Sequence, residues 1–206
     1  MKDSECFDFL KTLTSPEKIQ EYLYSVRYNP VAEIKSPKRV IETGIANCFE
    51  GSILAAAAFN LKGQEPLILD LVAVNDDDHI LALFKKKGYW GAISKSNTPL
   101  NEYREPIYRS LRELVMSYFD FYFNKFGQKT LRKYSRSFNL TPFNDRNWIT
   151  TVEDLEFIED DLNLTRHYSI LKPSIQGKFL RANPRLLKAG FLGAMKAGIY
   201  PANEIR

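Results

Sequence analysis

The sequence predicts an α+β fold in which one apolar helix, with Cys48 at its start, packs on a small antiparallel sheet. Three observations predict it. Residues 47–63 place helix start and stop signals around an apolar run, residues 66–94 alternate apolar runs with turns, and amphipathic patterns flank both. The composition is that of a globular protein, because 44% of the 206 residues are hydrophobic and 26% are charged. We expect one domain over residues 1–206, since this length is near the upper end for one core.

The region before the central helix is predicted to be structural scaffold. Ser15 and Pro16 are an N-cap and a first-turn proline, and the apolar residues that follow recur at helical spacing, which predicts a helix over residues 16–28. Asn29 precedes a proline and ends this helix. Residues 35–45 predict a loop or short helix that leads to the central helix.

The central helix begins with specific signals. Asn47 is a favourable N-cap, Glu50 stands three places later in capping-box position, and Gly63 is a preferred stop. The run between them is apolar on nearly every side, so we expect the helix to be surrounded by the rest of the protein. Cys48 is its first residue, and Gly51 leaves space for a close approach one turn later.

The remaining elements are predicted from apolar periodicity and turn residues. A meander of three strands is expected over residues 66–74, 79–84 and 89–94. From residue 101 onward we expect a helical extension, which runs to residue 206. It comprises a helix with an aromatic stripe over residues 107–126 and amphipathic helices around 152–163 and 184–196. We interpret the aromatic stripe as core, assign no chemistry to the last third of the chain, and expect His167 at the surface.

The composition and the first residues of the chain limit where the protein is expected to be located and what it is expected to bind. The first residues are acidic where a secretory signal would be basic, and the longest apolar run is far shorter than the roughly 20 residues that span a bilayer. We therefore expect a cytoplasmic protein that does not enter a membrane. The net charge of +4 is modest and does not by itself imply nucleic acid. Two cysteines are too few for a disulfide framework, and Cys6, on an apolar stretch, is expected to be a packing residue.

Cys48 and His79 are the candidate nucleophile and base. A thiol gains nucleophilic character at the positive end of a helix and beside an imidazole. The chain has two histidines, and His79 stands at the start of a strand after a turn, so the helix and strand between can fold back to bring it to Cys48. The peptide N–H groups at the helix start could receive an oxyanion.

The residue that would orient His79 depends on the register of the hairpin. If residues 85–88 form a four-residue loop, His79 faces Ser94, whereas a two-residue loop brings Ser96 opposite. Asn97 has the wrong parity unless a bulge or the strand end intervenes.

These residues resemble the transglutaminase-like superfamily, relatives of the papain-like thiol enzymes. The resemblance is carried by residues 47–51 (NCFEG), the pair Asp78 and His79, and residues 89–94 (YWGAIS), and it covers the core at residues 46–97. It implies a Cys on a helix start, with His and Asp on neighbouring strands, and a thiol-dependent acyl transfer from a peptide or amide substrate. Hydrolysis follows if water accepts the acyl group, and cross-linking follows if an amine does.

One departure concerns the third catalytic group. Residues 90–97, 104–106 and 117–119 resemble an uncharacterised branch of the superfamily, in which no reaction is established. The tryptophan-containing strand of the family ends in a catalytic Asp, where this chain has Ser94. Either Asn97 takes the role, as an amide does in papain-like enzymes, or Cys48 and His79 act as a dyad.

We expect no cofactor and no metal, because the consecutive aspartates 76–78 lack the spacing of ligands and are interpreted as caps of their turn. The alternative function is a catalytically inactive scaffold that binds an anionic partner through an arginine-rich face. That face would be formed by Arg104, Arg109, Arg112, Arg132 and Arg136.

Overall fold

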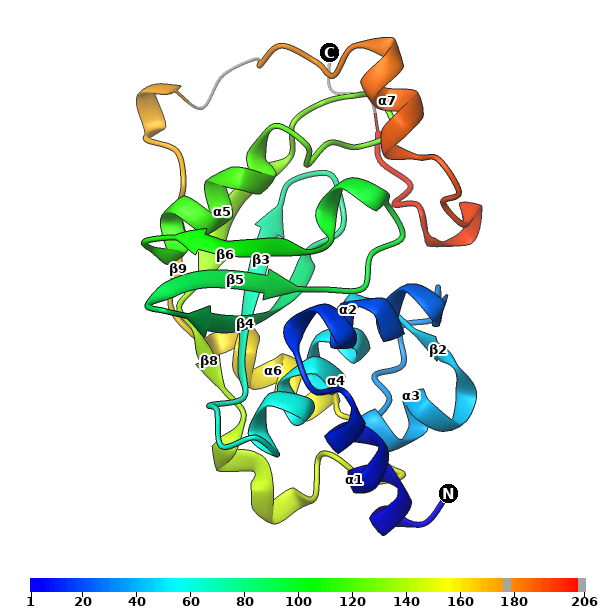
Figure 1. Cartoon of the computed structure of the whole chain (residues 1–206). Coiled ribbons are helices and arrows are strands. Elements are labelled where there is room, and N and C mark those ends of the chain that lie inside the picture. Colours follow the sequence, from blue (N-terminus) through cyan, green and yellow to red (C-terminus); the bar gives the residue numbers. More distant parts are fainter. Residues whose placement is uncertain (176–178, 204–206) are drawn as a thin grey trace.

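The chain forms a three-layer α+β arrangement in the computed structural model, which describes residues 1–175 and 179–203 (Figure 1). A seven-stranded antiparallel sheet in the order β6-β5-β4-β3-β7-β9, with β8 also paired to β3, forms the middle layer. Helices α1 to α4 and α6 gather on one side of it, and α5 covers the other (Figure 1). The predicted α+β class is confirmed, although the sheet is larger than expected.

The elements have the following bounds. The α-helices are α1 Asp3–Thr12, α2 Pro16–Ser25, α3 Pro37–Thr43, α4 Cys48–Asn60, α5 Leu111–Phe119, α6 Glu156–Leu164 and α7 Pro184–Gly190. The strands of the sheet are β3 Leu67–Ala73, β4 His79–Lys86, β5 Tyr89–Ile93, β6 Arg104–Tyr108, β7 Leu131–Ser135, β8 Phe138–Asn139 and β9 His167–Ser169. A separate parallel pair is formed by β1 Arg27–Tyr28 and β2 Ile45–Ala46, and 3-10 turns lie at η1 Pro99–Asn101, η2 Thr141–Arg146, η3 Pro173–Ile175 and η4 Lys196–Gly198. Among the described residues, no helix has the length and apolar character needed to cross a bilayer.

Helix α4 is the centre of the larger core. Every residue from Phe49 to Phe59 is buried, as expected for a helix without a polar face, and α4 packs chiefly on β4. Ser52 donates a hydrogen bond from its hydroxyl to the carbonyl of Ile80 at 2.8 Å, which ties the first turns of the helix to the start of β4. The helix start and the strand start are thereby brought together.

Strand β4 is apolar on both faces because both faces are covered. Ile80, Ala82 and Phe84 belong to the core that contains α4, while Leu81 and Leu83 belong to the core under α5. Successive side chains of a strand point to opposite faces, so a nearly continuous apolar run is what a middle-layer strand requires.

The predicted helical extension over residues 101–206 is wrong in part, because this region supplies strands β6 to β9. The apolar periodicity that predicted one helix over residues 107–126 is divided between β6 and the shorter helix α5. The last members of the aromatic stripe, Tyr122 and Phe126, lie in an irregular segment that ends at Gly127, whose φ is 73°. Helix α5 ends at Phe119, and the irregular segment that follows is held by backbone hydrogen bonds from Asn124 to Gln128 and from Thr130 to Tyr122.

Candidate active site

Cys48 is the first residue of α4, as predicted, and the capping box around it is formed. The side-chain oxygen of Asn47 accepts a hydrogen bond from the backbone N–H of Glu50 at 2.9 Å, and the Glu50 carboxylate accepts one from the backbone N–H of Asn47 at 2.7 Å. The backbone N–H of Cys48 lies between these two and is used by neither bond. The half-buried thiol therefore sits at the positive end of a well-ordered helix.

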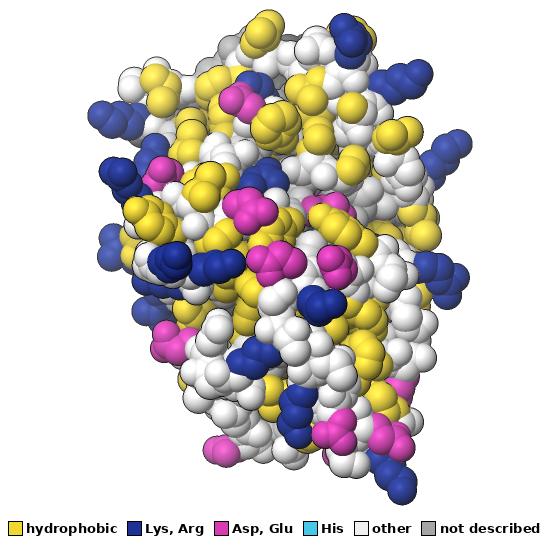
Figure 2. All heavy atoms as spheres, viewed as in Figure 1, with side chains coloured by type: hydrophobic (Ala, Val, Ile, Leu, Met, Phe, Trp, Pro, Cys, Tyr) yellow, Lys and Arg dark blue, Asp and Glu magenta, His cyan; other side chains and the backbone are white. Residues whose placement is uncertain are grey.

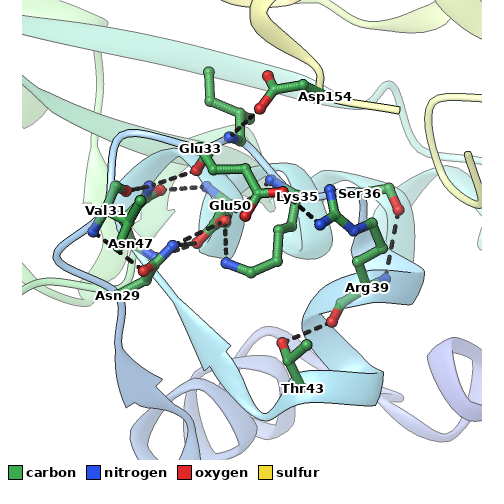
Figure 3. Close-up of polar contacts among 11 residues, drawn as sticks. Asn29, Val31, Glu33, Lys35, Ser36, Arg39, Thr43, Asn47, Glu50 and Asp154 are labelled. Atoms are coloured by element: carbon green, nitrogen blue, oxygen red, sulfur yellow. Dashed lines mark hydrogen bonds and ion pairs between the residues drawn. The ribbon is translucent and has the colours of Figure 1, made fainter. Parts of the chain in front are cut away.

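Two residues after Cys48 in α4, Glu50 is the hub of a buried polar cluster (Figure 3). Its carboxylate accepts hydrogen bonds from the backbone N–H and the ammonium of Lys35 at 3.0 and 2.7 Å, and from the side-chain amide of Asn29 at 3.1 and 3.2 Å. With Asn47, these residues form what we call the Glu50 cluster. Sequence reasoning recognised only the capping role of Glu50, because its ion-pair partner comes from a loop that carries no motif.

His79 is the first residue of β4 and is 6% exposed. Its Nε2 lies 2.8 Å from the carbonyl oxygen of Asn101 and 3.0 Å from the hydroxyl of Ser94, and this hydroxyl donates to the same carbonyl at 2.9 Å. A carbonyl only accepts, so Nε2 carries the proton of the neutral ring and Nδ1 keeps its lone pair. This is the tautomer in which Nδ1 can receive a proton.

The hairpin between β4 and β5 has the two-residue loop, so the four-residue alternative is wrong. Lys86 pairs with Tyr89, and the two loop residues, Lys87 and Gly88, have φ values of 53° and 87°. Two successive residues with positive φ are typical of a tight two-residue hairpin turn. The lysines at residues 85–87 gave no sequence signal for this turn.

Ser94 nevertheless reaches His79, although this register does not pair them. The ladder ends at the pair Ala82 and Ile93, so Ser94 follows the last paired residue of β5 and its hydroxyl is free to point across the strand end. Ser96, which the register would set opposite His79, instead contacts the hydroxyl of Thr98 at 3.1 Å.

Asn97 lies at the site but makes none of its hydrogen bonds to His79. Its amide donates to the carbonyls of Met195 and Gly198 at 2.9 and 2.8 Å, and its side-chain oxygen accepts from the backbone N–H of Met195 at 2.9 Å. The sequence offered no signal for these partners, which are about a hundred positions away. Among the described residues, Ser94 is the side chain that orients His79.

Two of the three aspartates in the turn before β4, Asp76 and Asp78, act as caps, as interpreted from the sequence. Asp78 accepts from the backbone N–H of Ala73 at 2.7 Å, and Asp76 accepts from the Thr130 hydroxyl at 2.7 Å and from the backbone N–H of Asp77 at 3.1 Å. Burial raises the pKa of Asp76 to about 6. No group of three acidic, histidine or cysteine side chains with metal-binding geometry exists within the described part of the chain.

Cys48 and His79 line the same cavity, whose volume is about 70 Å³. Tyr122 closes one side of it, with its ring 6.5 Å from that of His79 and its hydroxyl bonded to the carbonyl of Asp77. Cys48 also lines a larger groove of about 410 Å³ that extends along residues 29–34. Cys48 thus stands where the cavity and the groove meet.

Both groups of the pair are uncharged in this structure. Burial raises the pKa of the Cys48 thiol to about 12, against the opposing effect of a backbone hydrogen bond from Ile80. Burial likewise lowers the pKa of His79 to about 4, with the hydrogen bond to Asn101 acting in the other direction. Among the described residues, no hydrogen bond joins the two side chains. Burial favours the pair as thiol and neutral imidazole.

His167 is not the exposed residue that the sequence predicted. It lies on β9 with its side chain 17% exposed, and its Nε2 is 3.1 Å from a carboxylate oxygen of the buried Asp70. Burial raises the pKa of Asp70 to about 6, the nearby Asp78 raises it further, and the hydrogen bond from His167 lowers it. The strand β9 was missed in the sequence, so the partner of Asp70 was missed with it.

The arginines of the alternative, partner-binding face are largely used within the chain. Arg104 donates to Ser117 and stacks on the Tyr118 ring, Arg112 donates to the carbonyl of Ile170, and Arg132 and Arg136 also bond nearby groups. On the face drawn in Figure 2, basic side chains are dispersed and interleaved with acidic ones. This arrangement gives little support to a single anion-binding surface.

Comparison with known proteins does not assign the chain to a family. No protein-family model matches the chain. No curated protein sequence matches it either.

Proposed function

We propose that the chain is a cysteine-dependent acyl-transfer enzyme of the transglutaminase-like kind, which acts on a peptide or amide substrate with Cys48 as nucleophile and His79 as base. The observation that carries the proposal is the state of the His79 ring. Nε2 is held by Asn101 and Ser94, so the unprotonated Nδ1 is the nitrogen left for a cavity that Cys48 also lines.

The chemistry would proceed in two balanced steps. The thiol proton of Cys48 passes to Nδ1 of His79 while the sulfur bonds to the substrate carbonyl carbon, and the leaving amine then takes the proton from the imidazolium as the carbon–nitrogen bond breaks. Water or a second amine next attacks the thioester, gives its proton to His79, and releases the sulfur, which is reprotonated. In the tetrahedral intermediates, the free backbone N–H of Cys48 is placed to stabilise the oxyanion.

Ser94 takes the position at which the superfamily has an acidic residue. A hydroxyl beside Nε2 orients the ring but adds no charge to stabilise an imidazolium, so His79 should be a weaker base than in a full triad. Burial raises the pKa of the Cys48 thiol and lowers the pKa of the His79 imidazole, so proton transfer between them is unfavourable in this conformation. Both pKa shifts come chiefly from burial, so entry of solvent would reduce them together.

The test is acylation of the full chain by p-nitrophenyl acetate, followed as release of p-nitrophenolate and by the mass of the acetylated protein. Cys48→Ser should abolish acetylation at this position, and the matched variant Cys6→Ala should leave it unchanged, because Cys6 is fully buried in the core. His79→Gln should slow acetylation by about 10²- to 10⁴-fold, the usual contribution of a positioned base. Equal rates for His79→Gln and the wild type would refute the proposal.

Ser94→Ala separates the triad-like arrangement from a simple dyad. The variant keeps the bond from Nε2 to the carbonyl of Asn101 and removes the hydroxyl, so we expect acetylation to slow by about tenfold, the equivalent of one hydrogen bond. An unchanged rate would mean that the backbone carbonyl alone orients His79.

A further inference from the structure

Residues 195–203, which we call the strap, lie across the place where the cavity and the groove meet. After α7 the chain turns back toward the N-terminal helices and then returns, drawn in red at the end of the colour bar in Figure 1. Gly198, Ile199 and Tyr200 line both the cavity that holds Cys48 and His79 and the larger groove beside Cys48. The strap therefore forms a wall that the cavity and the groove share beside the candidate nucleophile.

Two asparagines hold the strap by its backbone. Asn97 pairs with the N–H and carbonyl of Met195 and with the carbonyl of Gly198, as described above. Asn75 repeats the pattern at the other end, where it donates to the carbonyl of Asn203 at 2.6 Å and accepts from its N–H at 3.1 Å. Both asparagines bond to backbone peptide groups of the strap, whatever its side chains are. The same two side-chain amides could therefore hold another polypeptide.

Between these contacts, the strap passes through a space that only glycine fits. A Cβ atom on Gly198 would lie 2.5 Å from the ring of Tyr28 and 3.0 Å from the side-chain nitrogen of Asn97. Tyr28 belongs to β1, which pairs with β2 just before Cys48, so its ring is fixed relative to the helix start. At Gly198 the strap is therefore in close contact with both Tyr28 and Asn97.

We propose that the groove beside Cys48 is a polypeptide-binding site and that the strap, which forms one wall of the groove, is a removable cover that a substrate must displace. The inference rests on the proposed function and specifies its substrate class as polypeptide. Burial by the strap also accounts for the uncharged state of the thiol and the imidazole, since removing a cover admits the water that favours their charged forms.

The experiment uses the full chain with Cys6→Ala, and compares Gly198→Ala with the control Ala189→Ser, whose side chain is exposed on α7 outside the strap. Trypsin cleavage after Lys196 reports release of the strap, and the rate of iodoacetamide labelling reports access to Cys48. Gly198→Ala should increase both, labelling by at least about tenfold, while Ala189→Ser stays within about twofold of the parent. A synthetic peptide with the sequence MKAGIYPAN, at about 1 mM, should slow labelling of Gly198→Ala again, and a scrambled peptide should not.

Three results would overturn the proposal. Faster cleavage after Lys196 without faster labelling would mean that the strap does not cover Cys48. Labelling that the peptide fails to slow would mean that the groove does not bind polypeptide. If neither Gly198→Ala nor the double variant Asn97→Ala, Asn75→Gly made Lys196 cleavable, the strap would be a fixed part of the fold.

The same measurements in a His79→Gln background separate this inference from the proposed function. Covering of Cys48 and protection by the peptide depend on binding and should persist without His79. Acetylation by p-nitrophenyl acetate should be lost. Peptide protection together with acetylation that is insensitive to His79 would leave the binding site intact and reject the enzyme.

Discussion

Two regions next to Cys48 are held in opposite ways. At the start of α4, Asn29, Lys35 and Glu50 of the Glu50 cluster are buried, and the cluster joins an ion pair with hydrogen bonds to both carboxylate oxygens. Beside the cavity and the groove that Cys48 lines, the strap is attached by neutral amide contacts in a segment that is mostly exposed. Buried charge is costly to disrupt, whereas an exposed hydrogen bond contributes little because water replaces it. The difference indicates that the Glu50 cluster, which we call the floor, is a fixed support for the helix start that carries the thiol. The strap, which we call the cover, can be displaced.

The largest effect is expected where the floor is broken. Glu50→Gln replaces one carboxylate oxygen by an NH₂ group that faces donors and leaves the Lys35 ammonium without its counter-charge, so the free energy of unfolding should fall by about 3–5 kcal/mol. Urea unfolding measures it. The control is Glu17→Gln, an exposed residue in the first turn of α2, which should stay within about 0.5 kcal/mol of the parent. A loss below about 1 kcal/mol for Glu50→Gln would remove the contrast between the two sides.

An intermediate effect on stability is expected at His79, which lines the cavity that the strap also lines. Its folded pKa of about 4 is below the usual value of 6.5, so between these pH values the unfolded chain binds a proton that the folded chain excludes. Stability due to neutral His79 is therefore complete above about pH 6.5 and is lost as the pH falls toward 4, by about 3 kcal/mol.

The measurement is the difference between wild type and His79→Gln in urea unfolding at pH 7 and at pH 4. Buried carboxylates such as Asp76, whose pKa is raised, change stability in the opposite direction, but they are common to both proteins and cancel in the difference. If the wild type loses no more stability than the variant on acidification, water already reaches His79 and the cover does not exclude it.

The smallest effect on stability is expected at the cover. Asn75 has a φ of 57°, so Asn75→Gly removes its two bonds to Asn203 without straining the backbone, and stability should fall by less than about 1 kcal/mol. Amide hydrogen exchange gives the sharper comparison. The N–H of Asn203 should exchange much faster in the variant, while that of Glu50 stays protected in both proteins. Equal protection of the two amides in the wild type would contradict the distinction between floor and cover.

Features that depend on residues close together in the sequence were predicted accurately. Features that depend on distant residues were not. Helix α4, its capping box, and strands β3 to β5 were predicted nearly in place, because capping residues and apolar periodicity act over a few positions. The hairpin register was left between two possibilities, since Lys87 in a left-handed conformation has no clear sequence signal. The strands β6 to β9 were missed, because β-structure depends on distant neighbours more than on local preference.

At the candidate site, the residue pattern revealed the chemical groups: a cysteine at a helix start, a histidine at a strand start, and a serine where the resemblance leads one to expect an acid. Their surroundings came from the way distant segments pack. Packing placed the carbonyl of Asn101 on His79, the ammonium of Lys35 on Glu50 at the helix start, and the strap on Asn97. These partners contribute backbone groups, or side chains from loops without a motif. Such contacts depend on how distant segments meet in space, and no local pattern of residues encodes them.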